Sequence, residues 1–443
     1  MGEDVIRKFL LGAVFILYFT FDASSKVLNV HDFVLEKGLK VVVVSNHKAP
    51  VGLVKLYYKA GSINDPNGKG GIAHLLEHMM FRGTKKVRGQ EFNTITEENG
   101  ADNNAYTTYL HTGYYEFSDI SKLELMLALE ADRMENLKLS EEVFLKERAI
   151  VLEERMQRFE TNPTTKFFES LNKFFWQKHP FSRPVSGEIE EIKNLKLEDA
   201  REFYEKYYNP SNAVLVIVGD VTVEEAKKLV GKYFAKIGNS KNIKNDTYQY
   251  VLDKNKSDLV MKIDGVLQPR FVGYWHLDSK MFSKKEILAL EFLMEFLFGD
   301  DTSYMIDKLV YKDKKYLSVD GGVDYDEKHG GKISFYIVPK DSSLSINEIK
   351  NDLNENLREG IDKICNQDVE RIKNETLSNV VYMLENPTSI AGFVGGLILD
   401  GFNVDAVENY DEMIKSISKE DIISVWKKVD NLDKKEVYGM IEI

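Results

Sequence analysis

Residues 71–80 read Gly71-Ile72-Ala73-His74-Leu75-Leu76-Glu77-His78-Met79-Met80. The apolar residues recur with a helical period, so the sequence predicts a helix over 72–81. On a helix, His74, Glu77 and His78 stand at positions i, i+3 and i+4 and share one face. Two imidazoles can then converge on a single cation while the carboxylate stays beside them. This decapeptide is therefore a candidate metal site carried by one helix.

Zinc suits this set, because it accepts two His and one carboxylate and keeps a further position open. The chain has 8 His and a single cysteine, Cys365, which excludes a cysteine-based metal cluster and an intramolecular disulfide. The alternative is an ordinary helix that carries two His and a Glu by chance. A five-residue motif has a real false-positive rate, and its spacing alone leaves both interpretations open.

A second helix offers a third ligand. We expect Ser140 to be its N-cap and Asn162-Pro163 to end it. Glu147 and Glu154 lie seven residues apart and therefore on the same face. One carboxylate would complete the metal site and the other would orient a ligand His. Without the His pair, these residues would be interpreted as a solvated charged face.

Around these helices, short β-rich runs alternate with helical ones, which is typical of α/β or α+β layers. The N-terminal part contains predicted strands at 41–44, 53–58, 113–117 and 213–219, and predicted helices at 123–137, 140–159, 197–207 and 223–234. Beyond a polar linker, predicted strands at 259–263, 270–275, 316–323 and 332–338 alternate with helices at 284–298 and within 346–384 and 405–427. The repeated rhythm predicts two homologous halves, each a mostly antiparallel sheet packed by helices.

The composition is that of an acidic globular protein with a leader. Of the 443 residues 43% are hydrophobic, and 59 Lys and Arg stand against 71 Asp and Glu, which disfavours nucleic-acid binding. The basic start, the apolar run 9–21 and the small residues 23–25 predict a secretory signal, with an uncleaved anchor as the alternative. The predicted boundaries are a signal peptide at 1–25, a zinc-binding domain at 26–236, a linker at 237–250 and a second domain without a metal site at 251–443.

The motif and its flanks resemble the pitrilysin/insulinase family of zinc metallopeptidases, in particular its mitochondrial-processing-peptidase-like branch. The stretch His74-Leu75-Leu76-Glu77-His78 matches the inverted zinc motif H-x-x-E-H. Matching flanks occur at 61–66, 81–84, 104–108, 147–154, 179–187 and 208–220. The resemblance is strong over about 30–235 and faint over about 250–443. It implies two halves that form a clamshell around a peptide chamber.

The resemblance also implies roles for individual residues. His74, His78 and Glu154 would be the ligands of one Zn²⁺ per chain. Glu77 would be the general base that takes a proton from water and returns it to the leaving amine, and Glu147 would be an acidic residue behind the ligands. Asn104 and Ala105 match the segment that holds an extended peptide as an added β-strand.

The second half departs from the family pattern. The family supplies an Arg and a Tyr from this half, but the matching segment, 309–319, carries Val310 and Leu317 at about those positions. We therefore expect a heterodimer with a homologous sister chain that supplies the missing pair. The alternative is a homodimer or a lone clamshell in which Tyr316 or Tyr311 is the donor.

The leading hypothesis is a zinc endopeptidase that cuts extended peptides or small unfolded proteins, with no nucleic-acid partner and no membrane attachment after signal cleavage. Two alternatives are a non-catalytic scaffold or assembly subunit of the same fold, and a peptidase dedicated to one precursor. The retained ligand set speaks against the scaffold. The apolar core of the leader favours export, most simply to a bacterial periplasm, over import into a mitochondrion.

Overall fold

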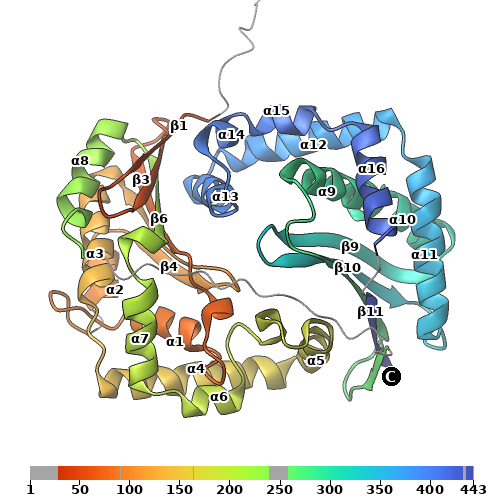
Figure 1. Cartoon of the computed structure of the whole chain (residues 1–443), viewed down its shortest axis with the longest axis horizontal. Coiled ribbons are helices and arrows are strands. Elements are labelled where there is room, and N and C mark those ends of the chain that lie inside the picture. The colour runs from red at the N-terminus through yellow and green to blue at the C-terminus, as the bar shows by residue number, and fades with distance from the viewer. Residues whose placement is uncertain (1–27, 90, 163, 239–257, 433–435, 443) are drawn as a thin grey trace, which may run out of the picture.

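Two mixed sheets, each covered by helices, lie side by side in the computed structural model (Figure 1). The structure describes residues 28–89, 91–162, 164–238, 258–432 and 436–442. The predicted signal peptide and residues 239–250 of the predicted linker lie outside these ranges. Within them, no helix combines the length and the apolar character needed to cross a membrane.

The first sheet has the strand order β1-β2-β6-β3-β5-β4. Its strands are β1 Val30–Val34, β2 Lys40–Ser45, β3 Val51–Tyr58, β4 Asp102–Thr107, β5 Thr112–Asp119 and β6 Ala213–Gly219. The central strand β6 reads AVLVIVG and is buried at every residue, because β-branched side chains fill both faces of a covered sheet. β2 and β6 run parallel, and every other pair of neighbouring strands is antiparallel. β4 is the last strand in this order and forms one edge of the sheet.

Most first-half helices pack on one face of this sheet, around a core that includes Leu56, Leu76 and Phe203. They are α1 Ile72–Met79, α2 Glu91–Glu98, α3 Leu123–Asn136, α4 Glu141–Thr161, α6 Ile189–Asn194, α7 Leu197–Tyr207 and α8 Val223–Phe234. The long helix α4 starts at an extended Ser140 and ends before Asn162. It packs against α1, which brings the two predicted ligand helices together.

The second sheet repeats the strand order of the first without its outermost strand. Its order is β7-β11-β8-β10-β9, formed by β7 Leu259–Lys262, β8 Arg270–Leu277, β9 Tyr316–Asp326, β10 Gly330–Pro339 and β11 Glu436–Glu442. The parallel pair β7–β11 occupies the place of β2–β6, and β8, β10 and β9 occupy the places of β3, β5 and β4. The predicted duplication is therefore visible in the topology.

Helices cover one face of the second sheet as well. They are α9 Lys284–Phe298, α10 Tyr304–Ile306, α11 Ile346–Lys363, α12 Asn366–Met383, α15 Tyr410–Lys415 and α16 Lys419–Asp430, with a π-helical turn at Asp307–Lys312. α9 follows β8 as α1 follows β3, so it occupies the place of the metal-motif helix. It carries no His, and nine of its residues form part of an apolar core.

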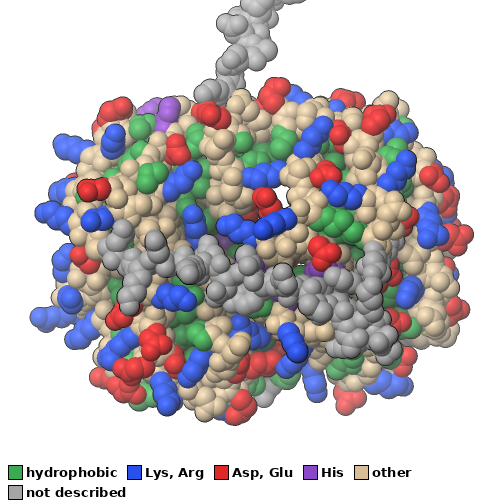
Figure 2. Space-filling model, in the orientation of Figure 1, with side chains coloured by type: hydrophobic (Ala, Val, Ile, Leu, Met, Phe, Trp, Pro, Cys, Tyr) green, Lys and Arg blue, Asp and Glu red, His purple; other side chains and the backbone are tan. Residues whose placement is uncertain are grey.

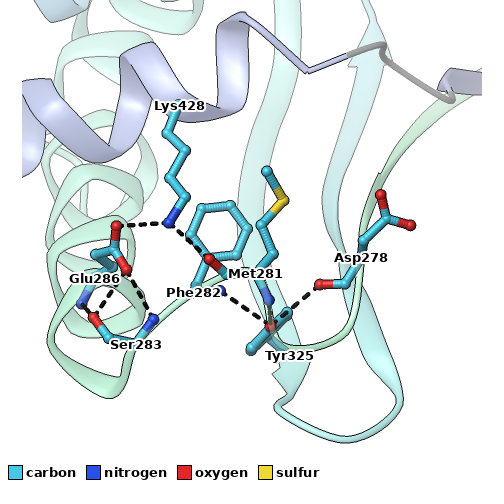
Figure 3. A network of polar contacts seen from close by, with 7 residues as sticks. All are labelled: Asp278, Met281, Phe282, Ser283, Glu286, Tyr325 and Lys428. Carbon is cyan, nitrogen blue, oxygen red and sulfur yellow. Dashed lines mark hydrogen bonds and ion pairs between the residues drawn. The ribbon is translucent and has the colours of Figure 1, made fainter.

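Figure 3 shows the polar network that starts α9, made by Asp278, Met281, Phe282, Ser283, Glu286, Tyr325 and Lys428. Ser283 and Glu286 form a capping box, in which the Glu286 carboxylate accepts from the Ser283 N–H at 2.8 Å. Lys428 of α16 donates to Glu286 at 2.8 Å, and the Tyr325 hydroxyl accepts the Met281 N–H at 2.9 Å. These groups satisfy one another's hydrogen bonds, so the network stabilises the start of α9.

The two halves exchange helices across their boundary. α5 Thr165–Trp176 follows α4 in the chain but packs on the second sheet, where Phe167 and Leu171 contact Val272. α13 Pro387–Leu399 and α14 Val404–Glu408 belong to the second half but pack on the open face of the first sheet (Figure 1). The Tyr57 hydroxyl donates to the Ala391 carbonyl of α13 at 3.1 Å. Each sheet is thus completed by a helix from the other half.

Candidate metal centre

The metal-motif helix α1 begins at a backbone position that requires glycine. Gly71 has φ +87°, and a Cβ there would lie 2.5 Å from the Ser186 carbonyl oxygen. The buried Asp65 carboxylate accepts the N–H of Gly71 at 2.7 Å and of Ala73 at 3.1 Å. A carboxylate satisfies the free N–H groups of a helix start and interacts favourably with its dipole. Asp65 therefore fixes α1 one turn before its first predicted ligand.

The structure brings His74, His78 and Glu154 together. One ligand atom from each of the three lies within 4.8 Å of the others. Glu154 Oε2 stands 3.5 Å from His78 Nε2 and 4.0 Å from His74 Nε2. Among the described residues this is the sole group of this kind, and it lies entirely in the first half.

The chemistry of these three residues fits zinc. Burial, followed by the charge of His78, lowers the pKa of His74 to about 3, so its imidazole is neutral and keeps a lone pair for a metal. The His74 Nδ1 atom is buried and makes no hydrogen bond to any described residue. Two imidazoles and a carboxylate are a common catalytic zinc set. On the far side of Glu154, Arg158 pairs with Oε1 at 2.5 Å.

Glu147 lies behind the ligands. Its side chain is 5% exposed, with Oε2 at 3.7 Å from His78 Nδ1 and Oε1 at 2.8 Å from Arg82 Nε. A carboxylate facing the second nitrogen of a ligand His fixes the orientation of the ring. Sequence reasoning placed Glu147 here but missed Arg82, although Arg82 lies in the flank 81–84 that carries the family resemblance.

Glu77 faces the same space as the ligands and is 9% exposed. Its Oε2 accepts a hydrogen bond from Thr107 Oγ1 at 2.5 Å. Burial raises the pKa of Glu77, and the Thr107 hydrogen bond opposes that rise. Thr107 was not predicted as a site residue. Strand alternation from Ala105 places it on the same face of β4 as Ala105 and was the signal that would have found it.

Asn104 and Ala105 lie in β4, the edge strand beside α1. Ala105 borders the space in front of His74 and Glu77. The side-chain oxygen of Asn104 accepts the Ala105 N–H at 2.8 Å. This edge donor is therefore occupied by the neighbouring side chain in the free chain.

The three candidate ligands line a cavity of about 850 Å³ between the halves. Its walls come from α1, β4, α4, α5 and the loop 182–186, and Tyr274 of β8 is the second-half residue among those that line it. Tyr316 donates to Asp352 and Tyr311 is half exposed, and neither lines this cavity. Figure 2 shows an opening between the halves near the centre of one face, with charged side chains of both signs at its margin.

His111 lies on the loop between β4 and β5, outside the cavity lining. Its ring makes edge contacts with Tyr57 at 5.6 Å and Tyr106 at 5.8 Å between centroids. Burial, followed by the charge of Lys55, lowers the pKa of His111 to about 4. It is a packed, neutral histidine.

Comparison with known proteins agrees with this geometry. The family profile described as insulinase (peptidase family M16) matches residues 40–188, and the profile described as peptidase M16 inactive domain matches residues 194–376. The zinc protease PqqE of Helicobacter pylori is 28% identical over 94% of this chain and 95% of its own length. The mitochondrial-processing peptidase subunit beta of Bos taurus is 33% identical, over 48% of this chain and 44% of its own.

The fold is shared with solved structures. The crystal structure of a protease from Helicobacter pylori matches with a TM-score of 0.83 at 24% identity, over 94% of this chain and all of that one. The fold match and the full-length relative extend the resemblance through the second half, where the sequence motifs were faint. Three observations indicate the same family: the two family profiles, the two-half clamshell fold and the inverted motif on α1. The chain belongs to the pitrilysin/insulinase family of zinc metallopeptidases, in the branch that resembles the mitochondrial processing peptidases.

Proposed function

We propose that this protein is a zinc-dependent endopeptidase that cuts extended peptides or small unfolded proteins within the cavity between its halves. The observation that carries the proposal is the convergence of His74, His78 and Glu154 beside Glu77, at an edge strand that borders this cavity. Homologous zinc proteases support a peptidase role for the chain. We propose one zinc ion per chain, bound by these three ligands.

Glu77 is the proposed general base. A bound zinc ion supplies a Lewis acid that polarises a carbonyl oxygen and lowers the pKa of water. Glu77 takes the proton from the attacking water and later returns it to the leaving amine. Its raised pKa suits both steps, because a general base works best when its pKa approaches the working pH. The Thr107 hydroxyl holds the carboxylate in one orientation.

We propose that β4 binds the backbone of the substrate. An extended peptide that pairs with this edge gains main-chain hydrogen bonds that are independent of its sequence. To donate to the peptide, the Ala105 N–H must first be released by the Asn104 side chain, which accepts it in the free chain. Specificity then depends on the side chains that flank the edge.

The test is metal content by mass spectrometry, together with cleavage of a quenched fluorescent peptide by the same samples. We expect about one zinc per chain in the wild type, chelator-sensitive cleavage, and loss of both zinc and cleavage in Glu154→Gln. Glu77→Gln should keep zinc and lose activity by about 10²–10⁴-fold. The matched control is Glu153→Gln, which removes the exposed neighbour of Glu154 and should keep both properties.

Two outcomes would contradict the proposal. Full activity of Glu77→Gln would remove the assignment of the base. Absence of zinc from the wild type would favour the scaffold alternative, in which the fold assembles with other subunits without catalysis.

We further propose that the chain works with a homologous sister chain. Among the described residues, the second half contributes Tyr274 to the cavity wall, and the sequence has no Arg between Arg270 and Arg358. Matched relatives are themselves named as beta subunits. Tagged protein purified from its own cells should carry a second chain of similar mass, and full activity of the pure single chain would contradict this.

We propose that the chain is exported to a bacterial periplasm, and this proposal rests on the leader alone. We also propose that the peptidase domain covers 26–236 and the second domain 251–443. Cell fractionation and sequencing of the mature N-terminus test this proposal. A mature chain that begins near Lys26 supports signal cleavage, whereas a retained N-terminus in the membrane fraction supports an anchor.

A further inference from the structure

Lys55 is a buried cation without an acidic partner. It lies in the middle of β3, and 6% of the residue is exposed. Within the described ranges no carboxylate pairs with it, and burial alone accounts for the lowering of its pKa. Burying an ammonium without a counter-charge is costly, and most buried charges in proteins are paired. A lysine in this position therefore calls for an explanation beyond packing.

Aromatic rings surround the ammonium but cannot neutralise it. Lys55 Nζ lies 5.1 Å from the ring centroid of Tyr57, 5.2 Å from that of Tyr106 and 5.8 Å from that of Tyr115. The ring faces attract a cation, which lowers the cost of holding it in this place. The neighbouring His111 is neutral at physiological pH, so it supplies no counter-charge to Lys55.

The strand register places this group in a row that reaches the edge strand β4. Lys55 pairs with Tyr115, and Tyr115 with Asn104, so the three form one cross-strand row that ends at β4. In the next row, Tyr106 of β4 and Tyr57 face each other across Gly113, where a Cβ would lie 2.9 Å from the Tyr106 ring. Tyr106 also lines the cavity beside His74 and Glu77. Tyr106 thus links Lys55 to the edge strand, because its ring lies 5.2 Å from Lys55 Nζ while the residue itself borders the cavity.

A peptide added to β4 presents alternate side chains to this face of the sheet, opposite the face that carries α1. We propose that Lys55, framed by Tyr106 and Tyr115, recognises a carboxylate of the bound peptide. The carboxylate is either the C-terminus of the peptide or an Asp or Glu side chain. Pairing with this anion gives Lys55 the counter-charge that the free chain lacks.

This inference rests on the proposed peptidase function, because it assumes that a peptide pairs with β4. The experiment measures binding by fluorescence anisotropy in zinc-loaded Glu77→Gln protein, which does not turn over. Three labelled peptides are compared. The first contains a Gln and ends in a C-terminal amide, and the second has the same sequence with a free C-terminal carboxylate. The third ends in an amide and has Glu in place of that Gln. The free acid reports recognition of the C-terminus, and the Glu peptide reports recognition of a side chain.

We expect one charged peptide to bind about 10-fold more tightly than the uncharged amide, the effect of one charge-assisted hydrogen bond. In the Lys55→Met background this ratio should fall toward 1, and in Lys55→Arg, which keeps the charge, it should persist. Lys228→Met is the control, because Lys228 is exposed on α8 and distant in sequence from β4. It should leave the ratio unchanged.

Equal binding of the three peptides by protein with an intact Lys55 overturns the inference, whether or not Lys55→Met folds. Persistence of the preference in folded Lys55→Met overturns it as well. Both results leave the proposed function intact, which cleavage of the uncharged amide by the wild type tests separately. Failure of every peptide to bind overturns the inference together with the proposed role of β4.

Discussion

At the scale of single residues, the site separates into groups that a motif specifies and groups that only folding brings in. His74, Glu77 and His78 follow from their spacing on one helix, and Glu147 and Glu154 from theirs on another. Thr107, Arg82 and Asp65 hold these residues from other segments. No spacing rule links Thr107 to Glu77, because their contact depends on the packing of β4 beside α1.

Replacing Thr107 tests its role as a positioning residue. Thr107→Val removes the hydrogen bond to Glu77 at nearly constant volume, and we expect kcat to fall about tenfold. Zinc content should not change, because Thr107 contacts none of the ligands in the structure. Thr107→Ser keeps the hydroxyl and should restore most of the activity, whereas equal activity of the Val and Ser variants would remove this role.

Replacing Glu147 tests the support behind His78. Glu147→Gln removes the charge that faces His78 Nδ1, and we expect the affinity for zinc to fall about 10–100-fold, measured by competition with a chelator. Glu142→Gln, on an exposed part of the same helix, is the control. Unchanged zinc affinity in Glu147→Gln would show that Arg82 and the packing of α4 are sufficient to orient His78.

At the scale of elements, the helices α1 and α9 occupy equivalent positions in the two halves but begin in different ways. α1 starts from a left-handed glycine and a buried Asp65 drawn from six residues earlier, whereas α9 starts from an ordinary capping box. The first arrangement positions the candidate ligands His74 and His78 in the lining of a cavity, and the second begins a helix of the apolar core. Element type followed well from periodicity in both halves, and the predicted strands and helices occur near their expected bounds.

Periodicity missed the exchanged helices α5 and α13, and it also missed the strands β1 and β11 and the helices α2 and α6. α13 reads PTSIAGFVGGLIL, with three glycines and apolar residues on all sides, so it has neither strong helical propensity nor a polar face. Its burial against β3 and β6 supplies the stability that its propensity does not. The segment predicted as helical over 405–427 is three short helices, α14 to α16, which are separated at Asn409 and at 416–418.

Two adjacent glycines of α13 test this packing. A Cβ at Gly395 would lie 2.5 Å from the buried Tyr57 ring, so Gly395→Ala should destabilise the protein by about 1–3 kcal/mol. Gly396 has no neighbour within 4 Å, so Gly396→Ala should be neutral or stabilise by up to about 1 kcal/mol. Thermal and urea unfolding measure both. Equal effects of the two substitutions would show that α13 is free to move away from the first sheet.

At the scale of the whole molecule, the halves are joined by the exchanged helices and by a group of buried aromatic and histidine side chains. His179 stands beside Phe181 and Trp176, and His276 and His329 of the second half lie against the same rings. Burial lowers the pKa of His179 to about 4 and lowers that of His329 from its usual value. The junction between the halves therefore contains two histidines, His179 and His329, whose pKa values are lowered by burial.

This arrangement predicts a dependence of stability on pH. In the unfolded chain His179 regains a pKa near 6.5, so the unfolded state binds more protons than the folded state between about pH 4 and 6.5. The contribution of the neutral His179 to stability is complete above about pH 6.5 and is lost as the pH falls toward 4. We expect His179→Gln to reduce the drop in Tm between pH 7 and 5, and His31→Gln, on the exposed side of β1, to leave it unchanged. A drop of the same size in both variants would assign the acid sensitivity to other groups.

The sequence by itself predicted the helix that carries the His pair, the two acidic positions of α4 and the two-half organisation, because helical spacing and strand periodicity are local properties of the chain. The ligand and base roles that we propose came from the resemblance of these motifs to a family. Tertiary structure alone decided how the halves exchange α5 and α13, which residues contact Glu77 and His78, and that Lys55 lies among aromatic rings with no acidic partner in the described part of the chain. Those features depend on contacts between segments far apart in the chain. Loop closure and the packing of one element on another fix such contacts, and no local pattern encodes them.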